Sequence, residues 1–191
     1  MAEFTGVEFT GERVIPGLVN DDLWNEHIAR YAFARFYAKD KRVLDAGCGS
    51  GFGSAELALS ASQVTGVDIA PEAVALSRAS YPLPRLRFVL ASCASLPFPA
   101  NAFDLVVAFE VIEHLADYRA FLNEAARVLR PGAPIIAVDS VESDGIRAFH
   151  QGDTYQPIDP ATLSARLRAA GFIDVEVRVN EYGWTALARR S

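Results

Sequence analysis

The chain has few cysteines, no cluster of positive charge and no long apolar run. Its 191 residues include only two cysteines, Cys48 and Cys93, whose positions do not match a metal-ligand spacing. We therefore expect no metal site and a reduced, cytoplasmic compartment. The formal net charge is −6 without any block of Lys and Arg, which argues against a nucleic-acid partner. No stretch approaches the roughly twenty apolar residues of a membrane span, and residues 1–20 lack the apolar core of a signal peptide.

Internal repeats, low-complexity tracts and a second region of distinct composition are also absent. A chain of this length can bury a full hydrophobic core as one domain. We expect a single domain over residues 1–191. In it, residues 1–40 form an irregular arm and a covering helix, and residues 41–191 form the main fold.

From residue 42 onward, strand and helix patterns alternate along the chain. The expected strands cover residues 43–46, 63–68, 86–91, 103–109, 135–138, 173–179 and 184–188. The expected helices cover residues 22–38, 53–60, 71–81, 118–129 and 160–170. The short link at residues 180–183 predicts an antiparallel hairpin. This pattern predicts an α/β, doubly wound, mostly parallel sheet of seven strands, with ligands bound at the carboxyl ends of the strands.

The glycine-rich stretch after the first strand carries the strongest functional signal. Residues 43–53 read Val-Leu-Asp-Ala-Gly-Cys-Gly-Ser-Gly-Phe-Gly. An apolar strand leads through Asp45 into a turn with four glycines, and a helix follows at once. Glycine lets the backbone approach a ligand closely at the start of that helix. The stretch therefore predicts a nucleotide or nucleoside pocket.

The residues around this turn narrow the class of ligand. Gly51 comes one residue too early for the dinucleotide fingerprint, whose third glycine is replaced by Phe52, and no Gly-Lys-Ser/Thr of a P-loop follows. Asp45 would repel a pyrophosphate but would favour an ammonium or a sulfonium. Asp68, which ends the second strand, suits the two hydroxyls of a ribose. A ribose joined to cationic groups without phosphate describes S-adenosylmethionine.

At these residues the sequence resembles the class I S-adenosylmethionine-dependent methyltransferases, specifically the small-molecule type related to the ubiquinone-biosynthesis methyltransferases. Five motifs carry the resemblance in order: the glycine motif at 43–51, Val-Thr-Gly-Val-Asp-Ile at 64–69, Ala-Ser-Cys-Ala-Ser-Leu-Pro-Phe at 91–98, Phe-Asp-Leu-Val-Val-Ala-Phe-Glu-Val-Ile-Glu-His-Leu at 103–115, and Leu-Arg-Pro-Gly at 129–132. The resemblance implies a Rossmann-like sheet of order 3-2-1-4-5-7-6 with the last strand antiparallel. It also implies methyl transfer from S-adenosyl-L-methionine to a small-molecule acceptor, with S-adenosyl-L-homocysteine as product.

The resemblance also implies roles for single residues. In that family the glycine turn wraps the methionine end of the cofactor, the acid at Asp68 binds the ribose, and the residue at Ile69 packs on adenine. The family usually has an acid where this chain has Ser92, which accepts more weakly from the adenine amino group. The expected cofactor-binding residues are Asp45, Gly47, Cys48, Gly49, Gly51, Asp68, Ile69, Ser92, Cys93 and Phe109.

The segment after the fourth strand should face the methyl acceptor. Histidine titrates near neutral pH, so His114 is our candidate general base; the alternative is that it packs behind the pocket. Glu110 and His114 would share a face if their segment is helical. Further candidates for the acceptor side are His27, Tyr31, His150, Asp153 and Tyr155.

Two other classes of function stay open at this point. One is a regulatory module that binds the cofactor without turnover, for which Ser92 is the hint. The other is a nicotinamide-dependent oxidoreductase, which Phe52 and Asp45 disfavour.

Overall fold

The computed structural model describes residues 14, 15, 17–142 and 155–191. Its elements in chain order are α1 (Asp21–Ala38), β1 (Arg42–Ala46), α2 (Phe52–Ala58), β2 (Gln63–Asp68), α3 (Pro71–Ser80), β3 (Leu86–Leu90), β4 (Leu105–Phe109), the 3-10 helix η1 (Ile112–His114), α4 (Tyr118–Val128), β5 (Pro134–Ser140), α6 (Pro160–Ala169), β6 (Phe172–Val179) and β7 (Gly183–Arg190).

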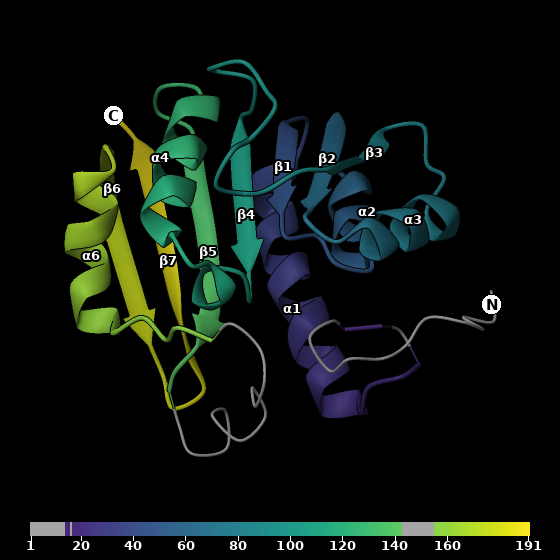
Figure 1. The fold of residues 1–191 in the computed structure, drawn as a ribbon, viewed down its shortest axis with the longest axis horizontal. Coiled ribbons are helices and arrows are strands. Elements are labelled where there is room, and N and C mark those ends of the chain that lie inside the picture. The colour runs from purple at the N-terminus through teal and green to yellow at the C-terminus, as the bar shows by residue number, and fades with distance from the viewer. Residues whose placement is uncertain (1–13, 16, 143–154) are drawn as a thin grey trace.

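The strands form one sheet of order β3-β2-β1-β4-β5-β7-β6 (Figure 1). β1 to β5 run parallel, and β7 runs antiparallel to both β5 and β6. The predicted fold class, strand order and reversed last strand are confirmed. Since the strand order changes direction between β1 and β4, the carboxyl ends of these strands form the natural ligand edge.

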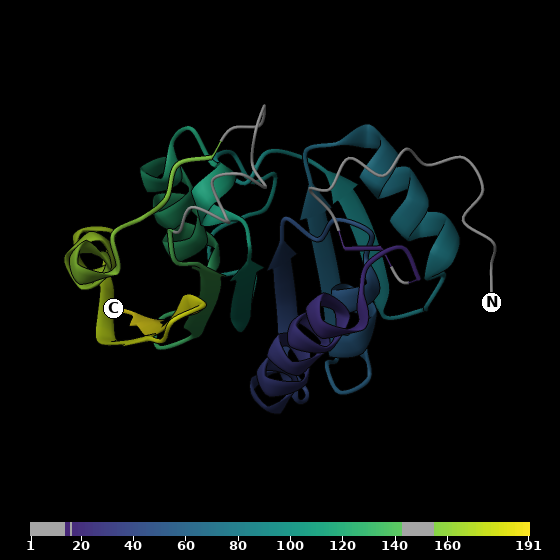
Figure 2. The same ribbon diagram turned by 90° about the horizontal axis from the view of Figure 1, so that it is seen from below.

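Helices cover both faces of the sheet. Figure 2 shows α1 on one side and α4 on the other. α1 begins after Asn20, whose side chain accepts a hydrogen bond from the N–H of Leu23 at 2.9 Å. On the opposite face, α4 buries Phe121 and Leu122 fully. Burial of such a side chain stabilises the fold by about 1.5–3 kcal/mol.

The predicted boundaries differ from those observed by at most two residues. β4 begins at Leu105 instead of Phe103, because Phe103 pairs only with Leu129 in an isolated bridge. The segment after β4 is not α-helical: Glu110 has a φ of 55° and only η1 follows. The condition under which Glu110 and His114 would share a helical face is therefore not met.

Candidate functional site

The glycine turn connects β1 to α2 at the carboxyl edge of the sheet. Gly47, Gly49 and Gly51 have φ values of 69°, 52° and 86°, a region that other residues adopt only with strain. A Cβ on Gly47 would lie 2.4 Å from Val111, and a Cβ on Gly51 would lie 2.6 Å from Ser77. Glycine is therefore required at both positions by the packing of the turn itself.

Three backbone N–H groups of the turn are bonded within the protein. The N–H of Cys48 donates to the carbonyl of Val67 and that of Gly51 to the carbonyl of Cys48, both at 2.9 Å. The N–H of Gly49 donates to the carboxylate of Asp68, also at 2.9 Å. An anion-binding turn instead points free N–H groups at the ligand. This turn is thus poorly suited to a phosphate, as its sequence predicts.

Asp68 and Ile69 lie beside the turn at the end of β2. The Oδ2 of Asp68 accepts from Gly49, and its Oδ1 accepts from the N–H of Ala70 at 2.9 Å. These bonds fix the carboxylate, and each oxygen keeps a lone pair for a further donor such as a ribose hydroxyl. Ile69 is 71% exposed and so offers an apolar surface next to the fixed acid. The two residues fit a ribose joined to a flat ring.

Asp45 lies completely buried under the turn. It accepts hydrogen bonds from the Oγ of Ser54 at 2.5 Å and from the hydroxyl of Tyr31 at 3.2 Å. Burial raises the pKa of Asp45 to about 7, although these two bonds oppose the rise. Both bonds come from side chains, so Asp45 does not hold the loop through backbone N–H groups. A cation above the turn would favour its ionised form.

Three further residues of the predicted cofactor set, Cys48, Cys93 and Phe109, are buried. Burial raises the pKa of the Cys93 thiol to about 12, so this thiol is a poor nucleophile at neutral pH. Phe109 packs edge-on against Tyr31, with the ring centroids 4.9 Å apart. Their side chains belong to the packing beneath the edge, and a contact with the cofactor stays a prediction.

Ser92 forms a tight turn after β3. Its Oγ accepts from the N–H of Ala94 at 3.2 Å, and its carbonyl accepts from the N–H of Ser95 at 3.0 Å. The hydroxyl therefore already stabilises the local backbone. Its role toward adenine also stays a prediction.

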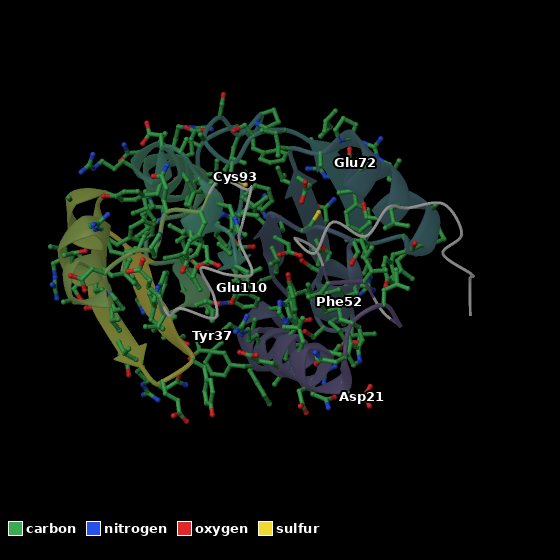
Figure 3. The ribbon with its side chains drawn as sticks, turned by 60° about the horizontal axis from the view of Figure 1, so that its bottom comes forward. Asp21, Tyr37, Phe52, Glu72, Cys93 and Glu110 are labelled. Carbon is green, nitrogen blue, oxygen red and sulfur yellow. The ribbon has the colours of Figure 1, made fainter. Side chains whose placement is uncertain are left out.

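The other half of the edge is formed by acids that follow β4 and β5. Glu110 forms an ion pair with Arg30 of α1 and accepts from the Oγ of Ser140 at 2.9 Å. Burial alone would raise the pKa of Glu110, but Arg30, Glu113, Ser140 and His27 together outweigh burial and lower it. Glu110 and Phe52, from the two halves of the edge, both lie next to α1 in Figure 3.

Glu113 and Asp139 are the most deeply buried of these acids, each 1% exposed. The Oδ1 of Asp139 accepts from the N–H of Val111 at 2.8 Å. Within the described part of the chain, no N–H or O–H donates to the Oδ2 of Asp139 or to either carboxyl oxygen of Glu113. Burial, Asp139 and Glu110 raise the pKa of Glu113 to about 10. Glu113 is therefore protonated at neutral pH.

His114 lies next to Glu113, with its Nε2 3.7 Å from the Oε1 of the acid. Its ring is 6.5 Å from that of Tyr155, measured between centroids. Because Glu113 is protonated, it does not supply the negative charge that would make His114 more basic. The role of His114 as general base stays a prediction. His150 and Asp153 lie outside the described residues.

α1 contacts both halves of the edge through two consecutive residues. Tyr31 donates to Asp45, and Arg30 pairs with Glu110. The ring of Tyr31 also lies directly over Gly53, where a Cβ would come within 1.9 Å of it. Tyr31 was one candidate for the acceptor side, but it is buried between α1 and the sheet. Sequence reasoning missed Arg30 altogether, because its only local sign is the spacing to Glu26 four residues earlier.

A cavity of about 210 Å³ lies at the opposite end of the sheet, away from the glycine turn. Its lining residues are Arg42, Gln63, Thr65, Arg87, Phe98, Pro99, Ala102 and Phe103.

Within the described ranges, no helix is long and apolar enough to cross a membrane. In the part of the chain that the structure describes, no group of three or more His, Cys, Asp or Glu could hold a metal ion.

The fold and the edge define a Rossmann-like protein for a nucleoside cofactor that carries no phosphate at the glycine turn. Comparison with known proteins agrees. Residues 44–137 match the family described as Methyltransferase domain. A probable S-adenosylmethionine-dependent methyltransferase of Mycolicibacterium smegmatis is 36% identical over 96% of this chain and 72% of its own length. The chain belongs to the S-adenosylmethionine-dependent methyltransferases, and its cofactor is S-adenosylmethionine.

Two further comparisons agree with the family and with the fold. The ubiquinone biosynthesis O-methyltransferase of Azorhizobium caulinodans is 34% identical over 70% of this chain, which spans 59% of that relative. The Haemonchus contortus phosphoethanolamine N-methyltransferase 2, solved with S-adenosyl-L-methionine, has a TM-score of 0.74 at 18% identity and covers 87% of this chain and 52% of its own. The latter likeness concerns the fold alone. The nicotinamide oxidoreductase and the inactive binding module are not favoured.

Proposed function

We propose that the chain methylates a hydroxyl group of an uncharged small molecule at the carboxyl ends of β4 and β5. The observation that carries the proposal is the placement of Asp68, which two backbone N–H groups fix beside the exposed side chain of Ile69. This supports a cofactor position over β1 and β2, which would leave the neighbouring edge for the acceptor. The name of the Azorhizobium relative supports oxygen as the attacked atom.

Named residues would hold the cofactor in this arrangement. Asp68 would bind the ribose, Ile69 would pack on adenine, and the turn at residues 47–51 would hold the methionine end. Asp45 would favour the cationic end from below the turn. S-adenosylmethionine supplies a methyl group that its positive sulfur already activates.

The protein mainly contributes alignment and exclusion of water. α1 lies against both halves of the edge through Tyr31 and Arg30, so it can orient cofactor and acceptor relative to each other. Glu110, Glu113 and Asp139 make the acceptor half rich in carboxyl groups. Glu110 is already paired with Arg30, so the described residues of this half hold no spare permanent cation for a carboxylate on the acceptor. A neutral hydroxyl compound needs no such cation.

Ligand-induced thermal shifts test the cofactor site. S-adenosylhomocysteine should raise the unfolding temperature, because a ligand that binds only the folded state stabilises it. NAD at the same concentration should have no effect. Stabilisation by NAD alone would contradict the assigned site.

Transfer of a labelled methyl group tests the acceptor. The full chain is incubated with methyl-labelled S-adenosylmethionine and matched pairs of phenols with and without a carboxylate, and the Asp68→Ala variant is the control. We expect label in the uncharged phenols. Label only in carboxylate compounds, or only in protein or RNA of an extract, would contradict the proposal. Binding of the cofactor without any transfer would support the inactive module.

A further inference from the structure

Glu110 and Glu113 are near enough for each to influence the pKa of the other. Glu113 is 1% exposed, and no N–H or O–H of the described residues donates to either of its carboxyl oxygens. A buried carboxylate without a donor is costly, whereas the protonated acid carries no charge. A proton on Glu113 is therefore what makes its burial tolerable.

The surroundings of the two acids are unequal. The Oε1 of Glu110 pairs with the Nη1 of Arg30, and its Oε2 accepts from the Oγ of Ser140. Glu113 has the buried acid Asp139 as its neighbour, and Arg30 acts on Glu113 more weakly than burial and the two acids do. Charge and hydrogen bonding both favour the ionised form on Glu110 and the proton on Glu113. The lowered pKa of Glu110 and the raised pKa of Glu113 agree with this order.

Titratable and charged groups face the pair from three elements. α1 contributes Glu26, His27 and Arg30, η1 contributes His114 beside Glu113, and β5 contributes Asp139. Burial and Arg30 lower the pKa of His27, so this imidazole is not a second cation at neutral pH. Among the residues that the structure describes, Arg30 is thus the permanent positive charge of this group.

We propose that Arg30 is a positioning residue of the acceptor side: its ion pair keeps Glu110 ionised while the proton resides on Glu113. The ion pair is then neutral overall, and the Glu113 carboxyl group is neutral too. An uncharged hydroxyl acceptor can lie against such an edge without an uncompensated charge nearby. This inference rests on the proposed function, in which the acceptor lies at this edge.

Infrared spectroscopy of the full chain tests the protonation pattern without any acceptor. A protonated carboxyl group has a carbonyl band that a carboxylate lacks. We expect this band at neutral pH in the wild type and its partial loss in Glu113→Gln. Asp139→Asn is recorded beside it, because burial also raises the pKa of Asp139 well above its usual value. A wild-type spectrum that Glu113→Gln leaves unchanged would overturn the proposal.

Variants of Arg30 then test its role in placing the proton. In Arg30→Gln the carboxylate signal of Glu110, identified with Glu110→Gln, should titrate about 1–3 pH units higher. Arg30→Lys keeps the charge and should restore most of the shift. Arg35→Gln removes another arginine of α1, which pairs with Glu56 at 3.5 Å, and should change nothing. Equal titration curves of Glu110 in Arg30→Gln and Arg35→Gln would contradict the proposal. If Arg30 had only a structural role, Arg30→Lys would not restore the titration of Glu110.

Calorimetric titration with S-adenosylhomocysteine keeps this test separate from that of the proposed function. Arg30→Gln should bind this ligand with an affinity within about threefold of the wild type, because Arg30 contacts the acceptor half (threefold is about 0.65 kcal/mol). Absence of binding in the wild type would refute the proposed function, yet the infrared result would still decide where the proton resides. With a phenol that accepts methyl, Arg30→Gln should lower kcat more than it changes the KM for S-adenosylmethionine.

Discussion

The two halves of the ligand edge hold their acids in different ways. On the cofactor half, Asp68 and Asp45 each accept two hydrogen bonds from fixed donors of the protein. On the acceptor half, Glu113 and Asp139 keep oxygens to which no donor of the described residues points. Fixed donors orient a carboxylate before any ligand arrives, whereas their lack makes the acid hold a proton. The first half is thus organised by fixed donors and the second by proton placement.

Among the variants that test this comparison, Asp68→Ala should have the largest effect, which is a loss of affinity for S-adenosylhomocysteine. In the proposed site it removes the acceptor of two charge-assisted hydrogen bonds to the ribose, and it leaves the N–H of Gly49 without its partner. At about 1.5–3 kcal/mol per bond, the affinity for S-adenosylhomocysteine should fall by a factor on the order of a hundred or more. Calorimetric titration measures this loss, and the circular dichroism spectrum should stay unchanged. Wild-type affinity in this variant would show that the cofactor half is not organised around Asp68.

Gly51→Ala tests whether the backbone of the glycine turn tolerates a side chain. The new Cβ would need a φ of 86° and would lie 2.6 Å from Ser77. We expect a loss of about 2–4 kcal/mol in the free energy of unfolding, from strain and overpacking together. Gly132→Ala is the matched control, since its φ is 76° but nothing lies within 4 Å of the Cβ; it should cost only about 1 kcal/mol. Urea unfolding of both variants separates the two contributions, and equal losses would leave no role for close packing.

Asp45→Asn tests the one acid of the cofactor half with a raised pKa. Asp45 loses its proton near pH 7 in the folded state but near pH 3.9 when unfolded. Between these values the folded state binds more protons, so the free energy of unfolding falls as the pH rises. Asparagine cannot ionise, so the variant should be more stable than the wild type at about pH 8, on the order of 2 kcal/mol.

The advantage of Asp45→Asn should vanish near pH 4, where Asp45 is protonated in the folded wild type. Thermal unfolding of both proteins across this range measures the difference. If the stabilities of the two proteins ran parallel across this pH range, Asp45 would keep the same charge throughout. The acids of the two halves would then differ less in their protonation than we infer.

Arg178→Gln should have the smallest effect on the free energy of unfolding. It removes the exposed ion pair with which the partly buried pair of Arg30 and Glu110 is compared. Arg178 and Glu176 are 81% and 53% exposed, and such surface pairs contribute about 0.2–1 kcal/mol or less. Arg30→Gln should cost more, because the Arg30 and Glu110 side chains are only 13% and 21% exposed and the acid would lose its cation. Urea unfolding compares the two variants. Equal changes would mean that the acceptor half tolerates an unpaired acid as well as the surface does.

The cofactor half could be predicted from sequence because its parts are local. The glycine turn, the acid before it and the strand-ending Asp68 are recognised from spacing, and periodicity predicts the strands that place them side by side. The structure adds what spacing does not contain. Asp45 is bound by Ser54 of the next helix and by Tyr31, which precedes it by 14 residues.

The acceptor half resists prediction because its contacts join distant segments. Arg30 and Glu110 are 80 residues apart, and no short motif links them. The left-handed backbone at Glu110 cannot be foreseen either, since non-glycine residues rarely adopt it. Protonation of Glu113 depends on burial and on two other acids, which are properties of the folded chain alone.

The close approach of Tyr31 to Gly53 has a consequence for how this protein can diverge. A methyl group at position 53 would need the space that the aromatic ring fills, so neither position can change in size alone. Across relatives the two positions should vary together, with a larger residue at 53 found where 31 is small. The angle at which α1 crosses α2 would then depend on the sizes of the residues at positions 31 and 53.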